Sequence, residues 1–428
     1  MQKRLIFTAA VFVLAVAAVA AVPPADNPTE GMMLGTWTRL KDVNGQPSGK
    51  AVKGGGGIIV LGGKVYLVLG NNKPDFMKYS IAANTWVFAC SIPLGPDKKK
   101  AKKGAWIVND GQHVYVLKGG GTNEFFRYDT LANSFESYAS PDFTKGVKNG
   151  AAVCVEYAGK KYIYALSGSN TNEWKRFNLE TRGWEPASPA SLPVEKAKAG
   201  SGLTSDGAGN VFFITYCDGE NRLFKTNIGT WTGSWTSARS LPSAAPGMSS
   251  KRKKVKEGAC LEYYDGKVWA VKGGSTREFW VYVPERDSWG YVGEVANGVS
   301  AEGIKCGRSL AAGTNGLYCI IGKNTNEFWL YNPAGIFASS SEPGVTGRRM
   351  SSTQVQVTAA SHAAGLVQVH YSGKGQALLT VRNCLGQHVW SGTSSSGTFI
   401  IPGLQPGSYF LGLTTLGHAE SRKLTILR

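Results

Sequence analysis

Short apolar runs alternate with turn residues along most of the chain. Residues 105–119 read AWIVNDGQHVYVLKG, and residues 260–273 read CLEYYDGKVWAVKG. In both segments two strand-like runs flank an Asp-Gly turn, which is typical of a β-hairpin. Two further strand-like runs follow before the next such pair begins. The pattern therefore predicts units of four short strands.

The units repeat at a nearly constant interval. After the second strand comes a loop, written GGGTNEFFRYD at residues 119–129 and GKNTNEFWLYN at residues 322–332. The first apolar residue after each loop is Phe76, Phe125, Trp174, Leu223, Phe279 and Phe328 in turn, with spacings of 49, 49, 49, 56 and 49 residues. A tyrosine or phenylalanine follows three positions later in most units, and a further aromatic residue, usually tryptophan, seven positions after that. Four strands in such a unit predict a blade of a β-propeller.

The two ends of the repeat predict how the ring closes. The last unit has Tyr331, but the position where the tryptophan is expected holds Ala338. A strand that carries a tryptophan, GTWTRL at residues 35–40, precedes the first complete unit. We therefore predict an all-β fold with a six-bladed propeller over residues 35–335. The N-terminal strand completes the last blade and closes the ring, so that the ring has no open edge.

The repeat resembles the kelch family. The shared features are paired glycines that end the second strand, the tyrosine and the tryptophan, and they extend over about residues 35–335. The resemblance implies a kelch-like propeller with its inner strands around a central channel.

A lysine lies just before the first strand in five of the six units, in the pattern Lys-x-Gly. These lysines are Lys53, Lys102, Lys148, Lys198 and Lys256, and the sixth unit has Ala301 with Gly303 instead. In an up-and-down blade, this link and the loop between strands two and three leave the sheet on the same face. We expect the lysines near the axis, as a basic mouth, beside candidate binding residues of the loops: Asn123, Glu124, Asn172, Glu173, Arg222, Glu278, Asn326 and Glu327.

An acidic residue directly precedes the first apolar residue in five units: Asp75, Glu124, Glu173, Glu278 and Glu327, with Arg222 in the remaining unit. Two interpretations stay open. The acids neutralise the lysines, one pair in each blade, while Asn and Thr side chains satisfy backbone groups of the loops. Alternatively, the lysines bind an anion, because charge of one sign in a concave site focuses the potential. The surplus lysines of KKKAKK (98–103) and KRKKVK (251–256) favour the second interpretation.

The formal net charge of +18 indicates a partner of acidic character, which we expect to be an extracellular glycan or protein. The two lysine runs contain no interleaved aromatic residue, so a platform for base stacking is missing. A nucleic-acid ligand is therefore not expected.

The predicted propeller has little of the chemistry of a catalytic or metal site. It contains only His113 of the five histidines, and the sequence has no G-x-S-x-G, H-E-x-x-H or GK[ST] motif. We predict a binding module with no catalytic residue, metal or cofactor. Two alternatives remain: a carbohydrate-active enzyme that uses carboxylates at the channel mouth, and a structural surface or matrix protein.

The sequence changes character after the last unit. Residues 336–351 are rich in Ser, Gly and Pro, as in a linker, and residues 352–428 contain seven alternating runs that predict a small immunoglobulin-like β-sandwich. This segment resembles the type A C-terminal sorting domain of bacterial type IX secretion, in LTVRNCLGQHV (379–389), PGLQPGSYF (402–410) and RKLTILR (422–428). The resemblance implies outer-membrane secretion machinery as a partner and attachment to the bacterial surface. An ordinary immunoglobulin-like adhesive module is the alternative.

Residues 1–22 have the pattern of a signal peptide. Lys3 and Arg4 precede an apolar run over residues 5–19, and Ala-Val-Ala at 18–20 offers a cleavage site. An uncleaved anchor is the alternative. We predict a secreted or cell-surface monomer with no transmembrane segment in its mature chain. Its seven cysteines follow no metal-binding spacing, and we expect most of them to be buried free thiols.

Overall fold

The structure, a computed structural model, consists of β-strands and loops in the part of the chain that it describes. The described residues are 35–333 without 188, 229–233, 247–253, 296–303 and 305–308, and the strands between 357 and 426 without 359–361, 364–365, 372–376, 384–387, 395–397, 403–406 and 416–417. The predicted signal peptide (1–22) and linker (336–351) lie outside these residues. No helix that could cross a membrane occurs among them. The fold is all-β, as the alternating pattern predicts.

Six four-stranded antiparallel sheets are found in the described part of residues 35–333. The first sheet comprises β2 (Gly57–Leu61), β3 (Lys64–Val68), β4 (Asp75–Ser80) and β5 (Thr85–Ser91). The second comprises β6 (Trp106–Asn109), β7 (Val114–Leu117), β8 (Phe125–Asp129) and β9 (Ser134–Tyr138). The third comprises β10 (Ala151–Tyr157), β11 (Lys160–Leu166), β12 (Trp174–Asn178) and β13 (Gly183–Pro186).

The fourth sheet comprises β14 (Gly202–Ser205), β15 (Asn210–Cys217), β16 (Glu220–Asn227) and β17 (Thr236–Leu241). The fifth comprises β18 (Cys260–Tyr264), β19 (Lys267–Val271), β20 (Glu278–Val283) and β21 (Ser288–Glu294). The sixth comprises β22 (Leu310–Gly313), β23 (Gly316–Ile320), β24 (Phe328–Pro333) and β1 (Gly35–Arg39). The sheets follow the sequence units, because tight turns join neighbouring strands. The turn between β18 and β19, for example, has Asp265 at φ 52° and Gly266 at φ 75°, the left-handed pair that a two-residue hairpin requires.

The N-terminal strand completes the sixth sheet. β1 pairs antiparallel with β24, from Gly35 opposite Pro333 to Arg39 opposite Trp329. The chain continues this pairing beyond the strand, because the backbone N–H of Leu40 donates to the Phe328 carbonyl over 2.9 Å. The pairing predicted from the missing tryptophan is therefore confirmed.

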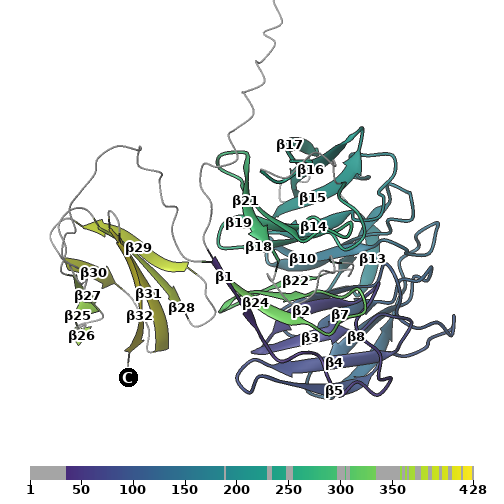
Figure 1. Ribbon diagram of the computed structural model, residues 1–428, viewed down its shortest axis with the longest axis horizontal. Helices are drawn as coiled ribbons and strands as arrows, with labels where there is room; N and C mark the ends of the chain where they lie inside the picture. Colours follow the sequence, from purple (N-terminus) through teal and green to yellow (C-terminus); the bar gives the residue numbers. More distant parts are fainter. Residues whose placement is uncertain are drawn as a thin grey trace, which may run out of the picture.

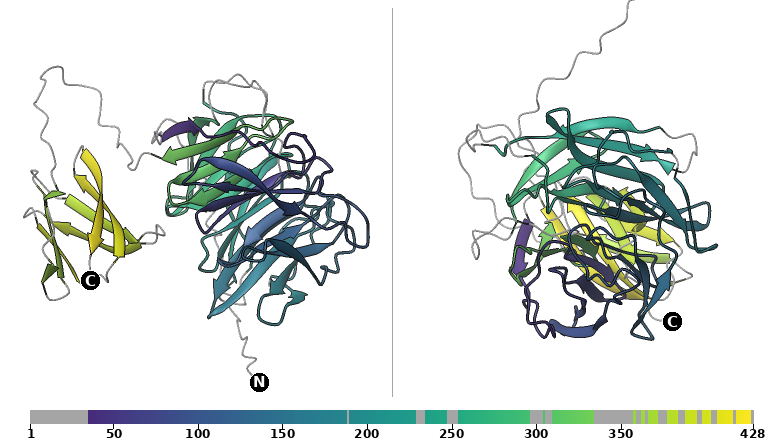
Figure 2. Two further views of the ribbon diagram at one scale, coloured as in Figure 1. Left: turned by 90° about the horizontal axis from the view of Figure 1, so that it is seen from below. Right: turned by 90° about the vertical axis from the view of Figure 1, so that its right-hand side faces the viewer.

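The sheets are arranged around a common centre (Figure 1). The first strands of successive sheets contact one another in the order β2, β6, β10, β14, β18 and β22, and β22 contacts β2 again. Figure 2 shows the same part from two further directions. A closed series of four-stranded sheets is consistent with a β-propeller.

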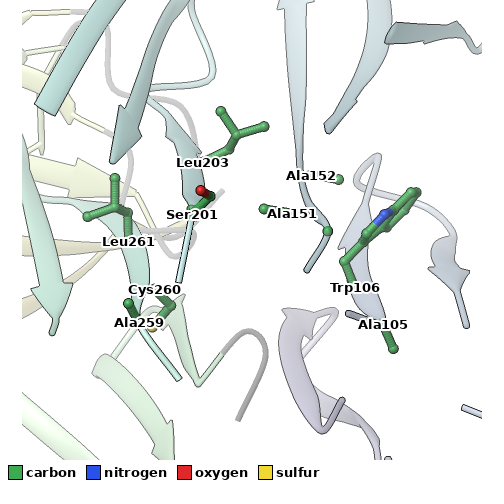
Figure 3. A pocket seen from close by; sticks show the side chains of 11 residues that line it. Ala105, Trp106, Ala151, Ala152, Ser201, Leu203, Ala259, Cys260 and Leu261 are labelled. Carbon is green, nitrogen blue, oxygen red and sulfur yellow. The ribbon is translucent and has the colours of Figure 1, made fainter. Parts of the chain in front are cut away.

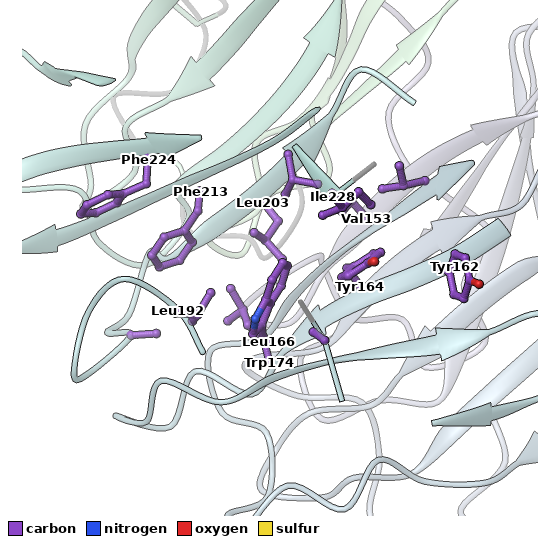
Figure 4. Packing of buried hydrophobic residues seen from close by; sticks show 14 of the residues in the cluster. Val153, Tyr162, Tyr164, Leu166, Trp174, Leu192, Leu203, Phe213, Phe224 and Ile228 are labelled. Carbon is purple, nitrogen blue, oxygen red and sulfur yellow. The ribbon is translucent and has the colours of Figure 1, made fainter. Parts of the chain in front are cut away.

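Aromatic side chains join each sheet to the next. Phe76 on β4 lies 4.8 Å from Tyr128 and 5.0 Å from Phe135 of the second sheet, measured between ring centroids. The equivalent contacts are those of Phe125 with Phe177 and Trp184, of Trp174 with Trp235, and of Phe328 with Tyr79 and Trp86. Figure 4 shows the core between the third and fourth sheets, where Trp174 lies near Leu192 and Leu203. The repeated aromatic positions of the sequence are thus contacts between sheets.

The sixth sheet receives its second aromatic residue from β1. Phe279 on β20 lies 5.0 Å from Tyr331 and 5.3 Å from Trp37. Trp37 also packs on Tyr331 at 4.9 Å. It therefore fills the role that tryptophan has in the other sheets, although it stands at the opposite end of the repeat region.

The C-terminal segment forms two further four-stranded sheets. One contains β25 (Val357–Thr358), β27 (Leu366–Tyr371), β26 (His362–Ala363) and β30 (Thr398–Pro402). The other contains β29 (His388–Ser394), β28 (Ala377–Asn383), β31 (Gly407–Thr415) and β32 (His418–Ile426). The seven predicted strand regions all contain strand residues, and the short β26 is an addition that the sequence pattern did not predict.

Candidate functional site

The segments that join the last strand of one sheet to the first strand of the next are called links here. Each link takes the number of the sheet that it enters. Four of the five Lys-x-Gly patterns form the same turn at the end of a link. In the second link, the carbonyl of Lys102 accepts the N–H of Ala105 over 2.9 Å, and Gly104 has φ 91°. These values define a type II turn, whose third residue needs a positive φ and so favours glycine. The turns that begin at Lys53, Lys198 and Lys256 have the same hydrogen bond and the same positive φ.

The third copy departs from this geometry. Gly150 does not have a positive φ, and the backbone N–H of Lys148 donates instead to the hydroxyl of Ser169 over 3.0 Å. Gly150 is nevertheless closely enclosed, because a Cβ added there would lie 2.5 Å from a methyl group of Val147. Glycine is therefore required at this position by the close approach of Val147 and not by a positive φ.

The turns of consecutive links pack against each other. A Cβ added to Gly55 would lie 2.1 Å from the carbonyl oxygen of Lys102, and one added to Gly200 would lie 2.4 Å from that of Lys256. No side chain fits at these positions, so the small size of glycine lets neighbouring links meet. These neighbouring links therefore meet at one end of the first strands, and we call their Lys-x-Gly turns the rim.

All five predicted lysines of the rim have exposed side chains. Lys102 and Lys256 lie over the loops between the second and third strands, since a Cβ on Gly120 or Gly274 would be 3.1 Å or 3.3 Å from the Cβ of the corresponding lysine. The structure thus brings the lysines and the repeated loops to one side of the sheets, which we call the link face.

The acidic residues before the aromatic positions bind the links and not the rim lysines. Asp75 accepts the backbone N–H of Ser48, and Glu173 accepts that of Thr144, over 3.1 and 3.2 Å. Glu124 accepts the backbone N–H of Asp97 over 2.9 Å. Four of the five acids are buried, the exception being the half-buried Glu173. The carboxylates of Asp75, Glu124 and Glu173 therefore replace water as acceptors for backbone groups of the links, whereas Glu278 and Glu327 accept the indole N–H groups of Trp280 and Trp329.

No ion pair found in the described part of the chain joins one of the five acids to one of the five rim lysines. The repeated acids and the rim lysines therefore do not form the direct pair in each blade that the first interpretation describes. The reason is geometric: the acids begin the third strands and point into the links, whereas the lysines extend outward from the turns.

Two buried lysines supply partners for the acids instead. Lys118 and Lys272 are completely buried at the ends of the second strands and form ion pairs with Glu124 and Glu278, the latter over 2.8 Å. The ammonium of Lys118 also donates to the carbonyl of Lys99 over 2.8 Å. Burial of a charge is costly unless it is paired and hydrogen-bonded, as both ammonium groups are. Sequence reasoning missed these pairs, although each lysine precedes the paired glycines of its unit.

The remaining predicted loop residues have mainly structural contacts. The side-chain amide of Asn123 donates to the carbonyl of Phe143 over 3.2 Å, and the side-chain oxygen of Asn326 accepts the N–H of Val52 over 3.3 Å. Asn172 is half-buried, and its carbonyl accepts the N–H of Leu192 over 3.0 Å. The side-chain contacts of Asn123 and Asn326 agree with the role of Asn in satisfying loop backbone groups, whereas the contact of Asn172 is made by its backbone.

Arg222 does not take the place of the missing acid in the fourth sheet. It forms surface ion pairs with Asp218 at 3.5 Å and Glu220 at 4.0 Å. The neighbouring Asn221 is buried, and its side-chain oxygen accepts the N–H of Val255 over 2.7 Å. A shift in strand register between residues 221 and 223 accompanies this exchange. The amide of Asn221 therefore performs the role that a carboxylate has in the other units.

An ion pair joins the second and fifth links at the centre of the link face. Lys103 lies 3.0 Å from Glu257, and the two residues are 154 positions apart in the sequence. The order of the first strands places β6 and β18 three steps apart in both directions, so this pair crosses the ring. Both residues line a cavity together with Gly55, Gly104 and Gly200. Sequence reasoning missed them because they occupy the variable position of the Lys-x-Gly pattern.

Behind this ion pair lies a cavity lined mostly by small side chains (Figure 3). Ala105, Ala151, Ser201 and Ala259 come from the starts of four different sheets. Buried Cys260 also lines the cavity, and its sulfur lies 2.9 Å from the hydroxyl of Ser309. Burial raises the pKa of this thiol, which therefore stays protonated at neutral pH.

The described residues include no group of three or more His, Cys, Asp or Glu side chains that could hold a metal ion. Five cysteines are free thiols, namely Cys90, Cys154, Cys217, Cys260 and Cys319, whereas Cys306 and Cys384 lie outside the described residues. The prominent chemistry of the link face is thus its charge.

No protein-family model matches the chain, and no curated protein is significantly similar to it. The solved structures to which the chain is similar include a protein named YjhT, which is 14% identical with a TM-score of 0.48, over 66% of this chain and 95% of that one. A protein of unknown function from Bacteroides thetaiotaomicron is 14% identical with a TM-score of 0.46, over 70% and 77% of the two chains. PorZ, a surface component of the type IX secretion system of Porphyromonas gingivalis, is 12% identical with a TM-score of 0.38, over 87% and 51%.

Proposed function

We propose that the protein is a secreted or cell-surface, six-bladed, kelch-like propeller whose link face binds an anionic extracellular ligand. The six four-stranded sheets, the closed series of contacts between first strands and the aromatic contacts from sheet to sheet support the propeller. In this proposal residues 35–335 form one binding domain, which functions as a monomer.

The observation that carries the proposal is that acidic and basic side chains are placed differently on the link face. The repeated acids are turned toward backbone groups and buried lysines, while the five rim lysines remain exposed. Because the repeated acids are turned away from them, the rim lysines outnumber the one acid that the structure describes at the centre of the link face, Glu257, and give a positive potential that concentrates anionic ligands. Because such an interaction is screened by salt, it should weaken as ionic strength rises.

In the same proposal, residues 1–22 direct export and residues 352–428 form an immunoglobulin-like sorting domain that engages outer-membrane secretion machinery. The two C-terminal sheets support a β-sandwich. Fusing residues 351–428 to a reporter in a host with type IX secretion tests the sorting role. A reporter that stays in the periplasm would count against it.

A screen of glycans and polyanions at low and high salt tests the binding function. We expect acidic ligands to bind at low salt, and the triple change Lys102→Glu, Lys198→Glu and Lys256→Glu to remove that binding. The control reverses Lys64, Lys160 and Lys161, which are exposed at the other ends of the sheets. Circular dichroism would verify that both variants are folded. Unchanged binding by the rim variant would refute the proposal.

A further inference from the structure

The second link is the most basic link in the described part of the chain. Residues 92–105 contain five lysines and one acid, whereas the described residues of each other link contain at most three lysines. Lys98 and Lys99 are exposed, and Lys100 is half-buried. None of these three side chains forms an ion pair with another described residue. Their ammonium groups are therefore available to an external anion.

The same link exposes an apolar side chain beside the lysines. Leu94 is 46% exposed, and no other large hydrophobic residue is exposed on the parts of the links that the structure describes. The ammonium of buried Lys118 donates to the carbonyls of Leu94 and Lys99 over 2.5 and 2.8 Å. Because one nitrogen atom reaches both carbonyls, the leucine and the lysines extend from adjacent parts of the backbone.

The loop that carries these side chains has a fixed shape. Ile92 and Ala101, at its two ends, are buried, and the N–H of Ile92 donates to the Pro74 carbonyl over 2.7 Å. Within the loop, the N–H of Asp97 donates to the buried carboxylate of Glu124 over 2.9 Å. Little further ordering is needed when such a loop binds, which favours binding.

An exposed leucine next to a cluster of lysines suits the boundary of a charged lipid layer. Apolar side chains enter the region between headgroups and acyl chains, and lysines close by are attracted to anionic headgroups. A lysine can also place its aliphatic stem along the apolar layer while its ammonium stays in water. A soluble polyanion, by contrast, offers no apolar phase for Leu94.

We infer that the second link binds an anionic lipid surface, into which Leu94 inserts while Lys98, Lys99 and Lys100 contact the headgroup phosphates. This inference goes beyond the proposed function, because these three lysines are not rim lysines. A protein partner suits the loop less well, since the centre of a protein interface is normally a larger apolar patch and the loop exposes one leucine.

Co-sedimentation of the full protein with lipid vesicles tests the inference. Vesicles of equal parts phosphatidylglycerol and phosphatidylcholine should bind the protein at low salt, and vesicles of phosphatidylcholine alone should bind it much more weakly. Added salt should weaken the binding, because it screens the attraction between lysines and headgroups. Inorganic phosphate should release no more protein than chloride of the same ionic strength, because a free anion does not replace the apolar contact.

Charge reversal separates this link from the other basic residues. Changing Lys98, Lys99 and Lys100 to Glu should weaken binding to the anionic vesicles about 100-fold, since each lysine near such a surface strengthens binding about fivefold. The matched control reverses three exposed lysines of the first, third and fourth links that are not rim lysines, namely Lys50, Lys145 and Lys196. The control alters the net charge by the same amount and should weaken binding clearly less.

Leu94→Ser tests the apolar contact, and Leu131→Ser is its control. Leu131 is 97% exposed on the turn between β8 and β9, at the strand ends opposite the link face. Leu94→Ser should weaken vesicle binding about 10-fold, also at high salt, because salt does not screen the burial of an apolar side chain. Leu131→Ser should leave the binding unchanged. Circular dichroism would verify that all variants are folded.

Three results would each overturn the lipid contact: no binding to the anionic vesicles at low salt, equal losses in the two charge variants, or no effect of Leu94→Ser. Binding of soluble polyglutamate as tight as that of vesicles, and independent of Leu94, would indicate an acidic protein partner instead. The proposed function fails separately, because it is refuted when no soluble polyanion binds the folded protein, whatever the vesicles show.

Discussion

Replacing Trp37 by alanine should weaken the closure of the ring. Trp37 is half-buried and packs between Phe279 and Tyr331, with centroid distances of 5.3 and 4.9 Å. Truncation of a fully buried tryptophan costs about 3–5 kcal/mol. Because Trp37 is partly exposed, we expect a loss of about 2–3 kcal/mol in the free energy of unfolding. That is a large fraction of the roughly 5–15 kcal/mol that stabilises a typical domain.

The matched control is Trp184→Ala. Trp184 has the equivalent position in the third sheet, is also half-buried, and contacts Phe125 at 5.3 Å. Its strand β13 follows β12 through a tight turn, whereas β1 is joined to β24 only by the strand pairing. Both changes should lower the denaturation midpoint, but only Trp37→Ala should also increase local opening of the sixth sheet.

Urea denaturation followed by circular dichroism measures the first effect, and amide hydrogen exchange of β1 and β24 measures the second. In a stronger version of the test, removal of residues 35–43 should abolish the single cooperative transition. A truncated protein that unfolds cooperatively with the original midpoint would show that the N-terminal strand does not hold the ring closed.

Three further predictions concern individual side chains. Trp289→Phe should cost about 1 kcal/mol, measured by urea denaturation, because it removes the 2.8 Å hydrogen bond from the indole to the Arg239 carbonyl. Burial alone would raise the pKa of Asp110, but hydrogen bonds from two backbone N–H groups and the Tyr115 hydroxyl outweigh it and lower that pKa. Asp110→Asn should therefore destabilise the protein near neutral pH, and the stability difference should shrink in acid-titrated melts as the pH falls below the ordinary value of 3.8. Burial raises the pKa of Cys154 to about 12. This thiol should therefore resist alkylation until the protein unfolds, which mass spectrometry can follow. The stability of the protein should fall as the pH rises above the ordinary value of 9.0, because the thiol of the unfolded chain ionises first.

The sheet boundaries could be predicted because each unit carries its own turns and aromatic positions. The spacing of 49 residues locates equivalent strands, and the absence of tryptophan at residue 338 locates the partner strand at the start of the repeat region. Both inferences depend on local patterns that repeat, so each unit supports the assignment of the others. The departure at Lys148 could not be predicted, since its Lys-x-Gly letters are the same as in the other copies; its N–H donates to the Ser169 hydroxyl, where that of Lys102 donates to the carbonyl of Lys118.

Charge pairing was predicted less well than the strands. One lysine and one acid per unit suggested mutual neutralisation, but the acid of the second unit reaches the buried Lys118, and Glu257 reaches Lys103 across the ring. A strand pattern depends on neighbours in sequence, whereas the partner of a long charged side chain depends on the paths of two separate loops. Sequence spacing therefore does not determine which opposite charge is nearest.

The different surroundings of the repeated acids and the repeated lysines explain why exposed basic side chains lie on one face. In three units the carboxylate before the third strand accepts a backbone N–H of the adjacent link, which replaces part of its hydration. A lysine on the tight turn of a link has no such acceptors around it, so its ammonium remains in solvent. Four units therefore bury their repeated acid, and five units expose their repeated lysine. Repetition of that arrangement around a ring would give the link face the positive potential on which the proposed ligand binding depends.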